Sequence, residues 1–170
     1  MEINQPAPDF SLPDLDGQLH CLSDFRGRIA VVEFWSAECA WVERVDQALL
    51  PLLRSWAGRV DLLTVVADPG EDRALLASAA LQRGLQFVLR AGPEVLDAYA
   101  VEVTPHFFVV DADGILRYSG GFDDVTFRHR NPTRSYLREA VEALLSGRLP
   151  NPMLTSAYGC AVVRQTPESC

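Results

Sequence analysis

Runs of apolar residues along this chain alternate with amphipathic stretches, which predicts strands and helices in turn. The run at 28–35, R-I-A-V-V-E-F-W, is almost continuously apolar, as is typical of a strand buried on both faces. Apolar residues then recur at three- and four-residue steps from Val42 to Trp56, which predicts a helix that begins at Cys39. A second apolar run, at 60–67, predicts the next strand. This part of the chain therefore has the order strand, helix, strand.

The alternation continues toward the C-terminus and ends in an antiparallel hairpin. Further helices are predicted at 71–83, 93–100 and 136–145, and further strands at 86–90, 106–111 and 115–120. The turn D-A-D-G joins the last two strands, and the turn D-L-D-G-Q predicts another hairpin near the N-terminus. The expected fold class is α/β, with a central mixed β-sheet flanked by helices and an N-terminal β-hairpin extension.

The length and the composition predict one folded domain. The chain has 170 residues, and 48% of them are hydrophobic, which is enough for a packed core. We expect residues 1–148 to form that domain, and residues 149–170, which begin with a proline-rich stretch, to form a C-terminal tail packed on the same domain. The oligomeric state stays open.

Charge and hydropathy exclude several classes of function. The net charge of −8 and the pI near 4.8 argue against a nucleic-acid-binding surface, which needs clustered basic residues. The first ten residues show no secretory signal, and no apolar run approaches the roughly 20 residues that span a bilayer. We therefore expect a soluble, cytoplasmic protein with no membrane partner.

The four cysteines are the main candidates for chemistry. Their positions, 21, 39, 160 and 170, include no pair with the spacing of a zinc site, so no metal is expected. Cys39 follows a buried strand and opens a helix, where the free N–H groups stabilise a thiolate. Cysteines at such places have pKa values lowered from about 8.5 to roughly 3.5–7.5. Cys39 is thus a candidate nucleophile, and the alternative is an inert cysteine packed under the helix.

Three motifs carry a resemblance to a known family. They are A-P-D-F-S-L-P-D-L-D-G at 7–17, V-V-E-F-W-S-A-E-C at 31–39 and V-T-P-H-F-F-V-V-D-A-D-G at 103–114. In this order they resemble the thioredoxin-like superfamily, and more narrowly the redoxin group, the alkyl hydroperoxide reductase and thiol-specific antioxidant (peroxiredoxin-like) family. The resemblance implies a thioredoxin fold and a thiol-dependent oxidoreductase that uses no metal, nucleotide or flavin cofactor.

The resemblance also implies roles for individual residues. Cys39 matches the attacking cysteine, and Pro105 matches a proline that the family holds in the cis form beside the site. That proline presents the backbone of Thr104 to an extended peptide; the alternative is an ordinary trans proline that begins a strand. Glu33 matches the buried acid of thioredoxins, which exchanges protons during disulfide exchange; the alternative is an acid facing solvent on an edge strand. Trp41 is a candidate for a docking surface around the sulfur.

Two departures from the family pattern limit the chemistry. Val42 stands where a thioredoxin has its second cysteine, so a dithiol exchange within C-x-x-C is excluded. The peroxiredoxin pattern has a hydroxyl residue, which Ser36 matches, and a proline, where this chain has Val32. The substrate is therefore open between a protein disulfide and a peroxide. A degenerate thioredoxin-fold binding module or redox sensor, without catalysis, is the alternative function.

The C-terminal segment T-S-A-Y-G-C-A-V-V-R resembles the end of a subgroup of peroxiredoxin-like redoxins. By that resemblance Cys160 is a resolving cysteine that forms a disulfide with Cys39, and an external thiol reductant restores the dithiol. The alternative is that Cys160 is a small buried residue anchoring the tail. Cys21 is expected to be a packed thiol and Cys170 a loose terminal one.

Some polar residues near these motifs have no assigned role. Asp123 and Asp124, in G-F-D-D, are candidates for a loop cap or for a polar contact with the tail. Arg117 and Arg128 are candidates to stabilise a thiolate, as an arginine does in peroxiredoxins, but no motif places either of them.

Overall fold

A five-stranded mixed sheet forms the centre of the protein. The computed structural model describes residues 1–162, so Cys170 and the end of the predicted tail lie outside the described residues. The strand order is β5-β4-β3-β7-β8. Strands β3, β4 and β5 run parallel to one another, and β7 and β8 are antiparallel to their neighbours. These strands are β3 (Ile29–Trp35), β4 (Val60–Val66), β5 (Phe87–Arg90), β7 (His106–Val110) and β8 (Leu116–Gly120).

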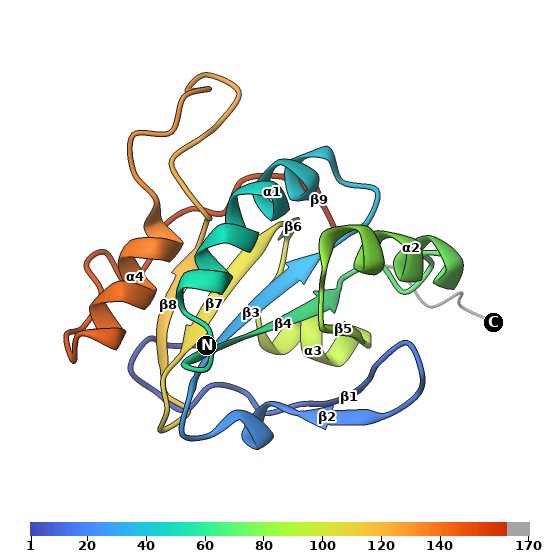
Figure 1. Cartoon of the computed structure of the whole chain (residues 1–170), viewed down its shortest axis with the longest axis horizontal. Helices are drawn as coiled ribbons and strands as arrows, with labels where there is room; N and C mark the ends of the chain where they lie inside the picture. Colours follow the sequence, from blue (N-terminus) through green and yellow to red (C-terminus); the bar gives the residue numbers. More distant parts are fainter. Residues whose placement is uncertain (163–170) are drawn as a thin grey trace.

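Helices cover both faces of this sheet (Figure 1). One face packs against α1 (Ala40–Ser55), α2 (Arg73–Arg83) and α4 (Tyr136–Leu145). The other face packs against α3 (Pro93–Ala98) and the N-terminal segment, which contains the hairpin of β1 (Ser11–Pro13) and β2 (Leu19–Cys21) and the 3-10 helix η1 (Leu22–Phe25). The predicted α/β thioredoxin fold, with its mixed sheet and N-terminal hairpin, is confirmed.

Strand β3 is the central strand, and all seven of its residues are buried. Successive side chains of a strand point to opposite faces. Val32 and Phe34 therefore join the core under α3, whereas Val31 and Trp35 join the core under α1 and α2. Glu33 lies between Val31 and Trp35 in the sequence, so it belongs to the face that α1 covers.

The start of α2 differs from the sequence prediction. The helix begins at Arg73, because the side chain of Asp72 accepts hydrogen bonds from the backbone N–H groups of Ala74 and Leu75 and so caps it. Glu71 is consequently a loop residue, and its side chain is free to point toward the loop that follows β3.

A second, smaller sheet joins two segments that lie far apart in the sequence. Strand β6 (Val103–Thr104) pairs antiparallel with β9 (Cys160–Ala161), with Thr104 opposite Cys160. Thr104 and Pro105 are joined by a cis peptide bond, as predicted, and Asn151–Pro152 is also cis. The chain between α4 and β9 crosses the molecule to reach β6 (Figure 1). We call residues 149–162 the C-terminal arm.

Candidate redox site at the start of α1

A disulfide bond joins Cys39 to Cys160, with 6.1 Å between their Cα atoms. Cys39 is the N-cap residue of α1, directly after the loop that leaves β3. Its Sγ atom lies 3.3 Å from the carbonyl oxygen of Thr104. The two cysteines are 121 positions apart in the sequence, and their bond closes this long loop where β3, α1, β6 and the C-terminal arm meet. Cys39 is 3% exposed, whereas Cys160 is half-buried.

Main-chain and side-chain hydrogen bonds hold the C-terminal arm in place. The N–H of Ser119 in β8 donates to the carbonyl of Met153 at 2.9 Å, and the N–H of Thr155 donates to the carbonyl of Ser119 at 3.0 Å. The hydroxyls of Thr155 and Tyr118 lie 2.6 Å apart. At the far end, the N–H of Val162 donates to a carbonyl beside β6 at 2.9 Å. The arm is therefore anchored on both sides of Cys160.

Gly159 lies in close contact with the cis-proline segment. A Cβ atom at this position would be 1.9 Å from the carbonyl oxygen of Thr104 and 3.1 Å from Cδ of Pro105. Only a residue without a side chain lets the arm approach β6 this closely. Gly159 therefore determines how near Cys160 comes to Cys39.

Three aromatic rings form a cluster beside the disulfide. Trp41, in the first turn of α1, contacts Tyr158 of the arm and Phe127 of the loop between β8 and α4, with ring centroids 5.0 and 5.4 Å apart. Phe127 and Tyr158 are 5.3 Å apart, and all three pairs are edge-to-face, the geometry that aromatic pairs favour. Trp41 thus lies beside the disulfide, whereas Trp35 is fully buried in the core. The predicted part of Trp41 in a docking surface stays a prediction.

Ser36 and Glu71 lie on the other side of the disulfide. A small cavity of about 50 Å³ is lined by Ser36, Thr104, Cys160 and neighbouring residues. Glu71 accepts a hydrogen bond from the N–H of Ala37 at 2.9 Å. Burial raises the pKa of Glu71, and hydrogen bonds from Ser36 and Ala37 act in the opposite direction. Sequence reasoning missed Glu71, because no motif marks a loop acid that folds back onto the site.

Glu33 is fully buried beneath α1, not at an edge facing solvent. Neither of its carboxylate oxygens has a hydrogen-bond partner among the described residues. Burial, and next the negative charge of Asp46, raise the pKa of Glu33 well above its usual value, and the guanidinium of Arg83 opposes them. Burial therefore favours the neutral form of Glu33 in the folded protein. Its predicted part in proton exchange stays a prediction.

Asp46 and Arg83 complete this buried polar group, and sequence reasoning missed both. The carboxylate of Asp46 accepts hydrogen bonds from Nε1 of Trp35 at 3.0 Å and from Nη1 of Arg83 at 2.9 Å. The guanidinium of Arg83 also lies 5.2 Å from the ring centroid of Trp35. Asp46 occupies the apolar face of α1, and a lone acid on such a face was the only sequence signal for this network.

We expect Glu33→Leu to alter the pH dependence of stability. The folded-state pKa of Glu33 is raised. Its contribution to the free energy of unfolding is therefore most favourable below the usual glutamate pKa, and it is lost as pH rises through the folded-state pKa. The variant should therefore be more stable than the wild type by about 1–3 kcal/mol at about pH 8, and by less at about pH 5. Urea unfolding of the oxidised protein at both pH values measures this.

The control for this prediction is Glu102→Leu, because Glu102 is exposed. Glu71 also has a raised pKa, and it is present in the wild type and in both variants. Its effect on the pH dependence of stability therefore cancels when each variant is compared with the wild type. An equal stability difference at both pH values would contradict the assignment of a raised pKa to Glu33.

The structure brings together Cys39, Cys160, Thr104, Pro105 and Ser36, and it places Trp41 at the rim. Arg117 is paired with Asp111 and lies elsewhere. Cys21 is a free, half-buried thiol. Within residues 1–162 no group of three or more histidine, cysteine or acidic side chains is placed to hold a metal ion. In the same residues no helix is both long and apolar enough to cross a bilayer.

Comparison with known proteins gives relatives of one chemical class. The chain is 33% identical over 120 residues to the thiol-disulfide oxidoreductase ResA of Geobacillus thermodenitrificans (strain NG80-2), covering 68% of this chain and 67% of the relative. It is 29% identical over 126 residues to the thiol:disulfide interchange protein DsbE of Allochromatium vinosum, covering 68% and 65%.

Two solved structures match nearly the whole chain. A hypothetical protein from Sinorhizobium meliloti 1021 has a TM-score of 0.84 at 28% identity, covering 95% of this chain and 94% of the other. An uncharacterized conserved protein from Geobacillus kaustophilus has a TM-score of 0.85 at 26% identity, covering 99% and 94%. The sequence profile described as the AhpC/TSA family matches residues 3–119, more than half of the chain. This protein belongs to the AhpC/TSA family.

Proposed function

We propose that this protein is a thiol-disulfide oxidoreductase in which Cys39 is the attacking thiol and Cys160 the resolving thiol. The observation that carries the proposal is the bond between these two cysteines, at the N-terminus of α1 and opposite Thr104. The relatives named as thiol-disulfide oxidoreductases support the same reaction class. Cys160 lies beyond residue 119, where the family match ends, so the resolving thiol comes from a part of the chain outside that match.

The reaction begins with the reduced protein. The thiolate of Cys39 attacks one sulfur of a substrate disulfide, so that a bond forms between Cys39 and that sulfur and the other substrate sulfur leaves as a thiolate. The thiolate of Cys160 then attacks Sγ of Cys39, and the second substrate sulfur leaves. The substrate gains two electrons. The protein loses two electrons, because its two thiols become the Cys39–Cys160 disulfide. An external dithiol reverses this change.

The geometry explains how the reaction proceeds without a C-x-x-C motif. Val42, at the place of a second cysteine in α1, is fully buried and packs in the core together with Trp35. The C-terminal arm instead carries Cys160 to the strand edge at Thr104, which is where it meets Cys39. The resolving thiol therefore arrives from β9 and not from the helix.

The substrate class that this site supports best is an extended polypeptide containing a disulfide. The backbone of Thr104 faces a strand partner, which is the geometry in which an extended peptide binds to a strand edge. Val32 stands at the place of the peroxiredoxin proline. It is fully buried on β3, so it cannot contact a peroxide at the site. Disulfide exchange is therefore preferred over peroxide reduction.

The test uses the reduced full-length protein and two oxidants, a disulfide-linked homodimer of a short cysteine peptide and hydrogen peroxide. We expect the peptide disulfide to convert the protein to the Cys39–Cys160 form faster than hydrogen peroxide at the same concentration. Mass spectrometry of the intact and digested protein measures the conversion and locates the bond. A non-reactive protein, which would indicate a binding module, or a bond formed by Cys21 instead, would overturn the proposal.

A further inference from the structure

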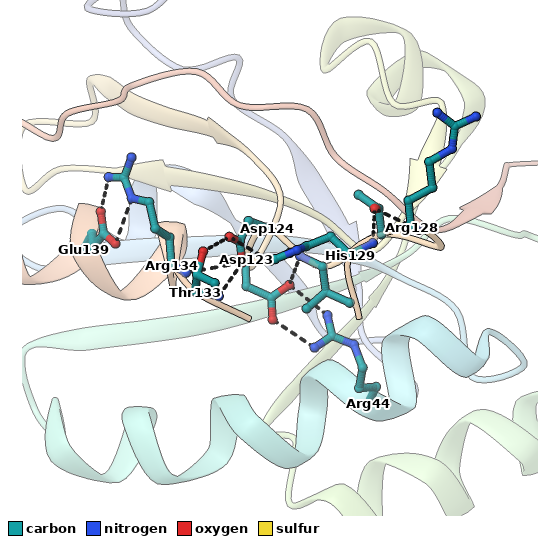
Figure 2. Close-up of polar contacts among 10 residues, drawn as sticks. Arg44, Asp123, Asp124, Arg128, His129, Thr133, Arg134 and Glu139 are labelled. Carbon is teal, nitrogen blue, oxygen red and sulfur yellow. Dashed lines mark hydrogen bonds and ion pairs between the residues drawn. The ribbon is translucent and has the colours of Figure 1, made fainter. Parts of the chain in front are cut away.

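The loop between β8 and α4, residues 121–135, projects from the body of the protein (Figure 1). Polar contacts fix its base. Figure 2 shows Asp123 turned toward Arg44 of α1, whose two terminal nitrogens donate to its two carboxylate oxygens at 2.8 and 3.0 Å. Asp124 accepts hydrogen bonds from the backbone N–H groups of Thr133 and Arg134 at 2.8 and 3.2 Å. The loop is thus joined both to α1 and to itself.

The tip of the loop is also ordered by hydrogen bonds. The N–H of Thr126 donates to the carbonyl of His129 at 2.7 Å, and the hydroxyl of Thr126 accepts hydrogen bonds from the N–H groups of Arg128 and His129. The Nε2 atom of His129 lies 3.3 Å from Asp124. A projecting loop with this many internal contacts presents its remaining side chains in a fixed arrangement, which lowers the entropy cost of binding a partner.

Phe127 is the apolar side chain at this tip. It is 69% exposed, although it contacts both Trp41 and Tyr158. The two contacted residues each lie two positions from a cysteine of the disulfide. An exposed aromatic ring supported by two others, directly beside the reactive bond, has the features of an anchor residue in a protein interface.

The tip is basic, whereas the protein as a whole has a net charge of −8. Arg128 and Arg130 are exposed, and neither forms an ion pair with any residue between 1 and 162. Figure 2 shows the side chain of Arg128 extending away from the loop. The two acids of the loop, Asp123 and Asp124, are already engaged at its base. The tip therefore presents uncompensated positive charge next to an aromatic ring.

The opposite side of the site has the reverse charge. Glu38 and Glu43 are exposed at the start of α1, and Asp68 lines the small cavity beside Cys160. A partner that approaches the disulfide thus meets a basic side and an acidic side. Such an arrangement favours one orientation of the partner and faster association at low salt.

We propose that Phe127, Arg128 and Arg130 form a docking surface for the redox partner, and that this partner presents an acidic segment with an apolar side chain beside its cysteine. Carboxylates would pair with the two guanidinium groups, which bind them in a bidentate manner. The apolar side chain would pack on Phe127. This inference rests on the proposed function and adds the chemical class of the partner to it.

The test measures how fast the reduced full-length protein reacts with three disulfides. Two are disulfide-linked homodimers of short peptides. Each peptide has one cysteine directly after a tryptophan, and this pair is flanked by aspartates in the acidic peptide and by lysines in the basic peptide. The third is 2-hydroxyethyl disulfide, which is small and uncharged. We expect the wild type to react with the acidic peptide about tenfold or more faster than with the basic peptide at low ionic strength, and this preference to shrink at high ionic strength.

Matched charge-reversal variants locate the effect. Arg128→Glu combined with Arg130→Glu should abolish or reverse the preference. Arg59→Glu combined with Arg148→Glu changes the net charge equally at two exposed arginines that form no ion pair with the described residues, and it should keep the preference. Phe127→Ala should slow both peptides but not the small disulfide. All variants should react with 2-hydroxyethyl disulfide at the wild-type rate.

The outcomes separate the two proposals. Equal rates for the two peptides, or an equal loss of preference in both double variants, would overturn the docking surface. A wild-type protein that does not react even with 2-hydroxyethyl disulfide would instead overturn the proposed function.

Discussion

Cys39→Ser is expected to reduce the rate of disulfide exchange by at least about a hundredfold, because a serine hydroxyl cannot replace the thiolate that attacks the substrate sulfur. Cys160→Ser is expected to behave differently. It keeps the attacking thiol, so the first step occurs, but nothing resolves the product. The variant should therefore accumulate a mixed disulfide between Cys39 and the peptide. Both variants are best made in a Cys170→Ser background, which removes the terminal thiol.

Intact-mass measurements over time distinguish these results. The wild type should show only a brief mixed disulfide before the Cys39–Cys160 form, and Cys160→Ser should hold the added peptide mass. Cys21→Ser is the control and should match the wild type, since Cys21 takes no part in the disulfide. If Cys39→Ser and Cys160→Ser lost activity equally without a trapped species, the two cysteines would not have the separate roles proposed for them.

Gly159→Ala is expected to weaken the Cys39–Cys160 disulfide without altering either cysteine. The added Cβ would lie 1.9 Å from the oxygen and 2.7 Å from the carbon of the Thr104 carbonyl, and backbone atoms cannot rotate away as a flexible side chain can. Overpacking of this kind costs about 1–3 kcal/mol, which corresponds to a roughly 5- to 150-fold lower equilibrium constant for forming the disulfide. Equilibration in buffers of reduced and oxidised glutathione measures that constant.

Ala161→Ser provides the control for this prediction. Ala161 is the next residue after Cys160 and its side chain is exposed, so an added hydroxyl meets no backbone atom and the equilibrium constant should stay near that of the wild type. The reduced Gly159→Ala protein should react with iodoacetamide at Cys39 at the wild-type rate, because the substitution leaves the surroundings of the reduced thiol unchanged. A wild-type equilibrium constant in Gly159→Ala would show that the close contact at Thr104 does not set the position of Cys160.

Much of the fold could be predicted because its signals are local. The apolar run at 28–35 and the helix that follows Cys39 are confirmed within one or two residues as β3 and α1. The turn residues at 111–114 and 14–18 predicted both hairpins, since positive backbone φ angles at Gly17 and Gly114 favour glycine. These elements depend on side-chain periodicity and turn chemistry, which one sequence contains.

The pairing of Cys39 with Cys160 was a different kind of prediction. The residues alone left Cys160 open between a resolving thiol and a packed anchor, and only the family resemblance favoured the first. The pairing depends on how the C-terminal arm lies against Ser119 and Thr104, through main-chain hydrogen bonds that no side-chain pattern encodes. Long-range backbone contacts of this kind cannot be read from periodicity.

The polar surroundings of the site were the least predictable part. Asp46 and Arg83 belong to different helices, and their contact with Trp35 depends on how α1 and α2 pack. Phe127 lies in a loop without regular structure, so its place beside Trp41 follows from the contact between Arg44 and Asp123. Each of these depends on tertiary packing, which overrides local preference.

The pairing of β9 with β6 has a consequence for the order of events in a catalytic cycle. One strand edge accommodates one strand, so a peptide that aligns with Thr104 must occupy the place that Cys160 takes in the oxidised protein. A molecule that has just completed its exchange has filled its own binding edge with its own chain. It therefore cannot recapture the product it has released, and each round must wait until a reductant frees the arm.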